Sequence, residues 1–243
     1  MKVSVILPAA GLGTRMKAAA EASGASRKQF LQLEGEPVLF HTIRKFVACP
    51  LIQEVVVALR ADDLVWVEPL LQAATFAKPV RCVAGGDSRQ QSVENALASL
   101  AEDVDVVAVH DAVRPFVDPA TIVEVIETAA RTGAAIVAIG PVDTVKQVHR
   151  HVVSGTIHRE RLALAQTPQV FRADVLRRAF ALARADGFTG TDESSLVERL
   201  ENVEVSVVPG SDRNIKITRP SDIELAKLFL AEEKARLASG GAA

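Results

Sequence analysis

Short apolar runs alternate along the chain with segments of helical periodicity. Residues 3–7 are almost entirely β-branched or aliphatic, which predicts a strand buried on both faces. Comparable runs predict further strands at 54–59, 80–83, 104–109, 133–139 and 203–208. Alanine, valine and leucine dominate the composition, which suits helices packed on a parallel sheet. The pattern therefore predicts an α/β protein whose sheet is mostly parallel.

Two predicted helices have a clear apolar face. One begins at Pro37 and runs to residue 46, and the other begins at Asp118-Pro119, a favoured N-cap and first residue. Their inward positions are Val38, Leu39, Ile43 and Phe46, and Ile122, Val125, Ile126 and Ala129. Further helices are predicted at 62–74, 93–100, 172–185, 194–200 and from Pro220 onward, the last with Leu225, Leu228 and Phe229 facing inward.

Residues 143–148 and 152–159 break this alternation. Both stretches are polar and favour β-structure, and we expect a turn near Ser154-Gly155. A two-stranded hairpin is marginally stable alone, so it needs a surface to pack on. A partner subunit is one such surface.

A further strand is predicted at 214–218, and it contains a lysine. Lys216 stands between two isoleucines. A lysine in a buried strand is uncommon and needs an anionic partner, which favours a functional role over a simple surface charge.

Small residues, two glycines and an arginine follow the first strand, in residues 8–16. Glycine lets the main chain turn tightly and approach a ligand, and main-chain N–H groups in such a turn point at anions. Arg15 adds a fixed positive charge, so a polyphosphate is the expected ligand. The alternative is a turn without a ligand.

Two familiar phosphate loops do not match this turn. A P-loop requires Lys-Ser/Thr after its last glycine, and none follows Gly13. A dinucleotide fingerprint requires a third glycine or alanine, where this chain has Met16. The strand at 54–59 also ends in Arg60 rather than in an acid.

A second glycine turn, residues 84–92, follows the predicted strand at 80–83. The carboxyl ends of strands line the ligand crevice in open α/β sheets, so this turn could read a base edge. Ser88 could equally be a helix N-cap, with Ser92 one turn further on. Lys28, just past the first turn, is either a ligand residue or a solvated charge.

An aspartate follows the strand at 104–109. Asp111 stands where a buried strand meets the sheet edge, and Mg²⁺ prefers one or two carboxylates together with phosphate oxygens. This position suits Mg²⁺. His110 is interpreted as a packing or hydrogen-bonding residue at the strand end, and no catalytic role is assigned to it.

Composition narrows the function classes. The formal net charge of −2 over 243 residues gives no basic field for nucleic acid or a membrane surface. Cys49 and Cys82 lack the spacing of a metal site or a redox motif, so we expect both to be small buried apolar residues. Met1 leads directly into a core strand and no run reaches membrane-spanning length, so we expect a cytoplasmic protein.

Seven motifs occur together and in order. They are Pro8-Ala9-Ala10-Gly11-x-Gly13-x-Arg15-Met16, Lys28-Gln29, Gly85-Gly86-Asp87-Ser88-Arg89, His110-Asp111-Ala112-Val113-Arg114-Pro115, Thr167-Pro168-Gln169, Thr191-Asp192-Glu193 and Asn214-Ile215-Lys216-Ile217-Thr218. On these motifs the chain closely resembles the 2-C-methyl-D-erythritol 4-phosphate cytidylyltransferase family of the non-mevalonate isoprenoid pathway. The similarity runs from residue 3 to about residue 230.

The resemblance implies a fold and a reaction. The fold is a Rossmann-like nucleotidyltransferase domain over residues 1–237, with a β-arm at about 141–161 that forms a homodimer, and residues 238–243 are expected to be a disordered tail. The reaction joins CTP and methylerythritol 4-phosphate, with Mg²⁺, and releases pyrophosphate. The substrate phosphate attacks the α-phosphorus in line, and a phosphate monoester needs no general base for this at neutral pH. Catalysis then depends on positioning and charge stabilisation.

The resemblance also implies roles for individual residues. Arg15, Lys28 and Lys216 would stabilise charge at the α-phosphate, and Asp111 would hold Mg²⁺. The nucleotide would contact Pro8, Ala9, Ala10, Gly11, Gly13, Gly85, Gly86, Asp87 and Ser92. The phosphate substrate would contact Arg114 and Thr167, and Thr144 and Arg159 from the partner's arm.

Two other functions are weighed against this one. Ribitol-5-phosphate cytidylyltransferase shares the early loop and the Lys-Gln-Phe run, but residues 191–198 and 214–220 look more like the methylerythritol enzyme. A domain that binds CTP without turnover would have no need for Arg15, Lys28 and Lys216 together.

Overall fold

The computed structural model describes residues 1–11 and 27–239. Its centre is a 7-stranded sheet with the order β11-β7-β10-β6-β1-β4-β5. The strands are β1 (Val3–Pro8), β4 (Ile52–Leu59), β5 (Val80–Ala84), β6 (Val106–Val109), β7 (Ala134–Ile139), β10 (Leu164–Arg172) and β11 (Ser206–Pro209). β10 is antiparallel to both of its neighbours, and the other pairs are parallel. The predicted mostly parallel sheet is confirmed.

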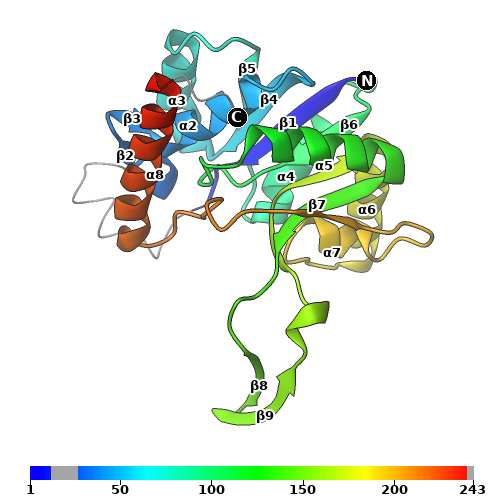
Figure 1. Cartoon of the computed structure of the whole chain (residues 1–243). Coiled ribbons are helices and arrows are strands. Elements are labelled where there is room, and N and C mark those ends of the chain that lie inside the picture. The colour runs from blue at the N-terminus through cyan, green and yellow to red at the C-terminus, as the bar shows by residue number, and fades with distance from the viewer. Residues whose placement is uncertain (12–26, 240–243) are drawn as a thin grey trace.

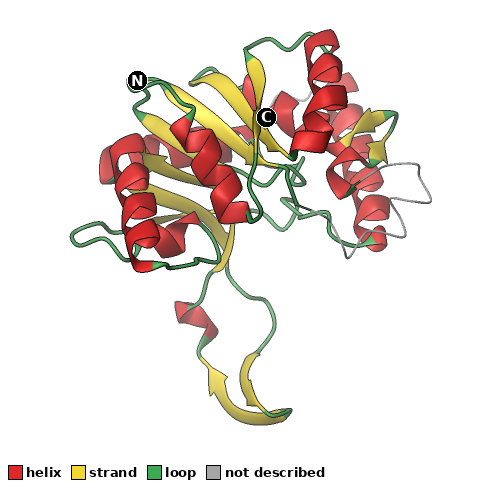
Figure 2. Cartoon of the chain, turned by 180° about the vertical axis from the view of Figure 1, so that it is seen from behind, coloured by secondary structure: helices red, strands yellow, loops and turns green. Residues whose placement is uncertain are grey.

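Helices cover both faces of the sheet (Figures 1 and 2). One face packs on α2 (Val38–Val47), α3 (Ala61–Ala73) and α5 (Pro119–Thr132). The other packs on α4 (Arg89–Ala98), α6 (Ala173–Asp186) and α7 (Glu193–Val197). β1 is buried on both faces of the sheet, because Val5 and Leu7 pack in the apolar cluster under the first set of helices and Ile6 packs in the cluster under the second. This explains its continuous apolar run.

The apolar faces predicted for α2 and α5 are buried as expected. The face predicted for the last helix, α8 (Pro220–Ala238), is wrong at two of its three residues. Leu225 and Leu228 are 40% and 54% exposed, whereas Ala226 and Leu230 are buried. Phe229 is partly buried and its ring packs edge-on against Phe116. α8 packs in a third cluster, beside the small hairpin of β2 (Gln32–Leu33) and β3 (Glu36–Pro37), and not on the large sheet.

No strand forms at 214–218, so that prediction is also wrong. The segment is irregular, and the Ile217 amide donates to the Val113 carbonyl at 2.9 Å. Ile217 is fully buried in the cluster that contains Ala226 and Leu230. The apolar character of this segment therefore reflects packing against α8 and not a place in a sheet.

The predicted polar hairpin projects from the body of the molecule as an arm (Figure 1). It consists of β8 (Val145–His149) and β9 (Val152–Ile157), paired in a sheet of their own. The turn lies at Arg150 and His151, which have φ angles of 47° and 66°, and not near Ser154-Gly155. Gly155 instead lies within β9, opposite Gln147.

The remaining elements agree with a folded core. Two further short elements are the 3₁₀ turns η2 (Lys28–Phe30), which precedes β2, and η3 (Arg159–Arg161), which follows β9. Both cysteines are free, Cys49 buried and Cys82 partly buried. Within residues 1–11 and 27–239, no helix is long and apolar enough to span a bilayer.

Candidate active site

The main chain after β1 is fixed from two sides. The Ala9 amide donates to the carbonyl of Ala58, a residue of β4, at 2.8 Å. The buried Gln29 amide group donates to the Ala9 carbonyl at 2.6 Å. Gln29 therefore holds η2, with Lys28, beside the first glycine turn. Two predicted site residues of this turn, Gly13 and Arg15, lie outside the described residues.

The second glycine turn lies against the first. The Gly85 amide donates to the Leu59 carbonyl at 2.6 Å, and a Cβ on Gly85 would lie 2.7 Å from that of Ala10. Because this approach leaves no space for a side chain, the sequence requires glycine here. The two turns thus form one continuous wall at the carboxyl ends of β1, β4 and β5.

Ser88 and Ser92 both stabilise the start of α4. Ser88 is the N-cap, and its hydroxyl accepts from the Gln91 amide at 3.0 Å. The Ser92 hydroxyl donates to the Ser88 carbonyl at 2.8 Å and accepts from the Gly86 amide at 3.1 Å. The capping interpretation of Ser88 is confirmed. Ser92 is buried and also lines the adjoining cavity.

Asp111 is a buried carboxylate surrounded by cations. Its Oδ2 lies 2.8 Å from Lys216 Nζ and 3.4 Å from Arg114 Nε, and its Oδ1 lies 3.4 Å from Arg89 Nε. Burial opposes ionisation of Asp111, but Lys216 and Arg89 outweigh it and hold the pKa of the carboxyl well below its usual range. The Asp111 amide donates to the hydroxyl of Thr167 at 3.1 Å. The group is a fixed anion at neutral pH.

The segment that carries Lys216 is held by a buried asparagine. The Asn214 side chain donates to the Thr167 carbonyl at 2.8 Å and to Gln166 Oε1 at 3.1 Å. Arg114 Nη1 donates to the Asn214 carbonyl at 2.6 Å. These contacts hold an irregular segment in the position from which Lys216 reaches Asp111, the anionic partner expected for it.

His110 has a structural environment. It is fully buried, its ring meets Phe46 edge-on with centroids 4.7 Å apart, and Nε2 lies 3.0 Å from the Arg114 carbonyl oxygen. Burial lowers the pKa of His110 to about 4. The packing interpretation is confirmed.

These groups surround a cavity of about 260 Å³. Its lining residues are Pro8, Ala9, Ala10, Gly11, Lys28, Gln29, Arg60, Gly86, Asp87, Ser88, Arg89, Ser92, Asp111, Ala112, Val113 and Lys216. Four of them are cationic, namely Lys28, Arg60, Arg89 and Lys216, and two are acidic, namely Asp87 and Asp111. This excess of positive charge suits a polyphosphate.

Not every predicted site residue reaches the cavity. Gly85, Arg114 and Thr167 lie behind its wall, where they contact lining residues. Thr144 and Arg159 lie at the base of the arm and do not line it. Arg159 Nη1 donates instead to the Val142 carbonyl. Within one chain, these two residues of the arm are therefore not part of the cavity lining.

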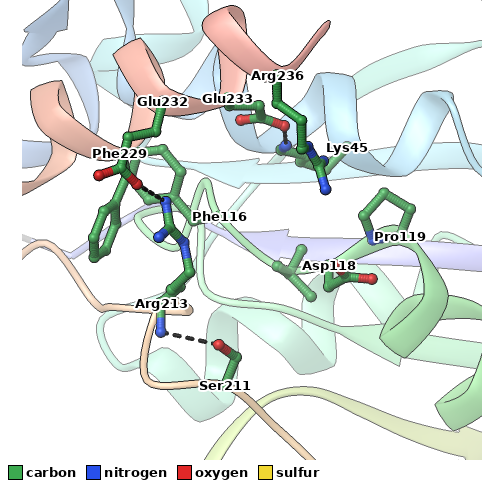
Figure 3. Close-up of a pocket in the computed structure, with 11 residues that line it drawn as sticks. Lys45, Phe116, Asp118, Pro119, Ser211, Arg213, Phe229, Glu232, Glu233 and Arg236 are labelled. Carbon is green, nitrogen blue, oxygen red and sulfur yellow. Dashed lines mark hydrogen bonds and ion pairs between the residues drawn. The ribbon is translucent and has the colours of Figure 1, made fainter. Parts of the chain in front are cut away.

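A larger hollow of about 380 Å³ lies between α8, Lys45 and the loops around Phe116 and Ser211 (Figure 3). Four of its charged groups form two pairs, Arg213 with Glu232 at 2.6 Å and Lys45 with Glu233. Among the described residues, no glycine turn lines it. We therefore place the candidate active site in the smaller cavity.

The sequence analysis assigned no role to three residues at the cavity and its wall. Arg60 lines it from the end of β4, and its Nε is buried with no hydrogen-bond partner in the described part of the chain. Arg89 and the buried Glu193 form an ion pair at its wall, with Nη1 2.7 Å from Oε1. Arg60 directly follows a strand that the sequence predicted, and Arg89 directly follows the predicted helix N-cap Ser88. These neighbouring features were the available signal that the two arginines lie near the ligand crevice.

Comparison with known proteins identifies the family. The model of the 2-C-methyl-D-erythritol 4-phosphate cytidylyltransferase family matches residues 3–232. The chain belongs to this family. A relative of that name from Solibacter usitatus is 64% identical over 241 residues, covering 97% of this chain and 98% of the relative. Another, from Acidobacterium capsulatum, is 54% identical and covers 97% of this chain and 100% of the relative.

Solved structures of the cytidylyltransferase family have the same fold. The 4-diphosphocytidyl-2C-methyl-D-erythritol synthase of Anaerococcus prevotii has a TM-score of 0.81 at 29% identity, covering 94% of this chain and 98% of that one. The cytidylyltransferase of Thermus thermophilus has a TM-score of 0.76 at 33% identity, covering 94% and 98%. The predicted nucleotidyltransferase fold is confirmed, and the protein is a nucleotidyltransferase enzyme.

Proposed function

We propose that the cavity binds CTP and that the enzyme transfers its cytidylyl group to 2-C-methyl-D-erythritol 4-phosphate, releasing pyrophosphate. The observation that carries this proposal is the convergence of Lys28, Lys216 and Asp111 on one cavity beside two glycine turns. The relatives and solved structures described above are named for this activity, which does not favour the ribitol phosphate alternative. The cavity and both glycine turns belong to one proposed domain, residues 1–237.

The residues of the cavity suit an in-line displacement at the α-phosphorus. A phosphate monoester is already a nucleophile at neutral pH, so no side chain needs to remove a proton. Lys216, held at the cavity by Asp111, and Lys28 would offset the negative charge that grows on the α-phosphate and the leaving pyrophosphate. Arg15 is proposed to do the same from the segment outside the described residues.

The second glycine turn is proposed to bind the base and ribose. Gly86, Asp87 and Ser92 line the cavity here, and Gly85 packs behind them against Ala10. Main-chain groups have fixed positions, so they distinguish an amino group from a carbonyl oxygen at the same place on a pyrimidine. Preference for cytosine is proposed to arise here.

Asp111 suits Mg²⁺ on the chemistry of its donor group. The described residues contain no cluster of three histidine, cysteine or acidic side chains, so a metal held by protein alone is not expected there. A single carboxylate at a polyphosphate site fits Mg²⁺, which takes its other ligands from phosphate oxygens and water. Bound Mg²⁺ would neutralise triphosphate charge and orient the reacting oxygens. Lys216 would then share its carboxylate partner with the metal.

The arm is proposed to make the enzyme a homodimer with shared sites. Val148, Val152 and Val153 on the arm are 57%, 67% and 58% exposed, and the described part of the chain offers no surface that covers them. Contiguous exposed apolar residues mark an interaction surface. Thr144 and Arg159 would then contact the phosphate substrate in the partner's cavity, beside the partner's Arg114 and the partner's Thr167.

A pyrophosphate-release assay tests the proposal. The enzyme is given CTP with either 2-C-methyl-D-erythritol 4-phosphate or ribitol 5-phosphate, each with Mg²⁺ and with EDTA. We expect pyrophosphate only with the methylerythritol substrate and Mg²⁺. Release with ribitol phosphate would favour the alternative, and binding of CTP without release from either would indicate a domain that only senses the nucleotide.

A further inference from the structure

Glu193 is a buried carboxylate just outside the cavity. It is 1% exposed and is the first residue of α7. Both of its oxygens accept from Arg89, Oε1 from Nη1 at 2.7 Å and Oε2 from Nη2 at 2.9 Å. Burial raises the pKa of the Glu193 carboxyl, and the Arg89 guanidinium opposes that rise. The proposed chemistry does not yet use this pair.

Arg89 faces a second carboxylate inside the cavity. Its Nε lies 3.4 Å from Oδ1 of Asp111. One guanidinium is thus divided between a bidentate contact to Glu193 and a single, longer contact to Asp111. Two parallel N–H···O bonds are the stronger and more directional arrangement, so Glu193 determines where Arg89 lies.

The start of α7 is fixed so that Glu193 cannot follow Arg89 into the cavity. Asp192 caps the helix, and its Oδ1 accepts from the Ser195 amide at 3.0 Å. The buried Gln169 of β10 donates to Asp192 Oδ2 at 2.7 Å and accepts from the Ser194 amide at 3.0 Å. The sheet therefore holds the carboxylate in place behind the cavity wall.

We propose that Glu193 is a positioning residue that retains Arg89 at the wall and thereby keeps Asp111 available to a divalent cation. This inference rests on the proposed role of Asp111 as the metal carboxylate. Without the charge of Glu193, Asp111 is the one carboxylate left in an ion pair with Arg89 among residues 1–11 and 27–239. Three cations, Arg89, Arg114 and Lys216, would then compete with the metal for one anion.

The same change has opposite consequences for metal and nucleotide. Removing the Glu193 charge makes the cavity more positive, which disfavours a cation and favours the triphosphate. Residues that orient metal ligands change metal affinity about 10–100-fold when replaced. If Glu193 only stabilised the fold, its replacement would instead weaken the binding of metal and nucleotide together.

The test uses Mn²⁺ as the probe and needs no turnover. Water proton relaxation in Mn²⁺–CTP solutions is titrated with the full chain, in the absence of the phosphate substrate, and CTP binding in EDTA is measured by calorimetry. For Glu193→Gln we expect Mn²⁺ affinity to fall about tenfold or more, while CTP binding in EDTA is retained or strengthened. Glu198→Gln removes the same charge from an exposed position just after α7 and should leave both quantities unchanged.

A double variant separates positioning from stability. In Arg89→Gln/Glu193→Gln no guanidinium remains to compete, so Mn²⁺ affinity should return to within about threefold of the native value. If the single variant fails to fold, the double variant, with a neutral pair in place of the ion pair, decides alone. Loss of Mn²⁺ affinity in the double variant overturns the proposal, as does an unchanged affinity in a folded Glu193→Gln protein.

Asp111→Asn in the same titration tests the assumption beneath the proposal. Retained Mn²⁺ affinity in this variant would show that the proposed metal role of Asp111 is wrong. If Asp111→Asn loses the metal and Glu193→Gln does not, the metal assignment stands and only the positioning role of Glu193 fails.

Discussion

Lys216 Nζ lies 2.8 Å from Oδ2 of Asp111. The family resemblance implies separate roles for these two residues, one at the α-phosphate and one at the metal. Their contact means that each determines where the other lies. The lysine is held at the cavity from an irregular segment, although its side chain is 36% exposed.

The charge at the α-phosphate leads to the first prediction. Lys216→Ala should lower kcat on the order of 10²–10³-fold with a small change in KM for CTP, because the charge it offsets grows during transfer. Lys28→Ala and Arg15→Ala should behave alike. Steady-state pyrophosphate release measures both constants. Lys227→Ala, an exposed lysine paired with Glu224 on α8, is the control. Near-native turnover in Lys216→Ala would exclude it from the catalytic residues.

The second prediction concerns the base. The enzyme should prefer CTP over UTP in kcat/KM, because a site with fixed hydrogen-bonding groups leaves buried groups unpaired when offered the other pyrimidine. Initial rates with each nucleotide at saturating phosphate substrate give the ratio. Equal kcat/KM values would contradict base reading by the second glycine turn.

The third prediction concerns the contact between the two glycine turns. In Gly85→Ala the new methyl group would lie 2.7 Å from the Cβ of Ala10 and 2.9 Å from the Ser92 hydroxyl. CTP binding, measured by calorimetry, should weaken about tenfold or more, because both turns must move apart. Gly140→Ala, where nothing lies within 4 Å of the added carbon, is the matched control. Equal binding by the two variants would contradict the proposed nucleotide position.

The fourth prediction concerns sharing of the active site. Lys28→Ala and Arg159→Ala chains are each expected to be nearly inactive, but a mixture that exchanges subunits should recover activity. In each heterodimer one site carries both defects, and the other has a native Lys28 and a native Arg159 from the partner. A mixture of Arg15→Ala with Lys28→Ala cannot form an intact site and is the control. If exchange is demonstrated and activity stays at the control level, Arg159 acts within its own chain.

The fifth prediction concerns Cys82. Burial raises the pKa of its thiol from 9.0 to about 12. Because the raised pKa favours the protonated form, the thiolate at pH 8 should be about 1,000-fold scarcer than in an unfolded chain. Iodoacetamide labelling followed by mass spectrometry should show slow reaction of the native protein and rapid reaction in guanidinium chloride. A native rate that levels off near pH 9 would contradict the shift.

The sheet and its main helices were predictable because their apolar patterns are local. α2 and α5 illustrate this, since their predicted inward residues are all buried. The last helix and residues 214–218 were not predictable in the same way. Ile217 is buried under α8, a contact between segments whose packing surfaces are set by tertiary structure and not by periodicity.

The candidate site shows the same division. Asp111 and Lys216 could be selected because a charge beside buried strand residues needs a reason. The pairing of Arg89 with Glu193 joins positions 104 residues apart, and the two motifs that contain these residues do not indicate that they meet. Whether Thr144 and Arg159 serve a partner's cavity also depends on a contact between chains. Thr144 and Arg159 were selected through the family resemblance and not through their local sequence chemistry.

The arm leaves the sheet and returns to it at one place. Ile139, the last residue of β7, pairs with Leu164, the first residue of β10. The arm is therefore an extended connection between two positions that are already neighbours. The entropy of closing such a connection grows slowly with its length, so arms of different length can be accommodated on the same sheet at little cost to the free energy of unfolding. The length and contacts of the arm can thus diverge in evolution while the sheet and the cavity at its edge are retained.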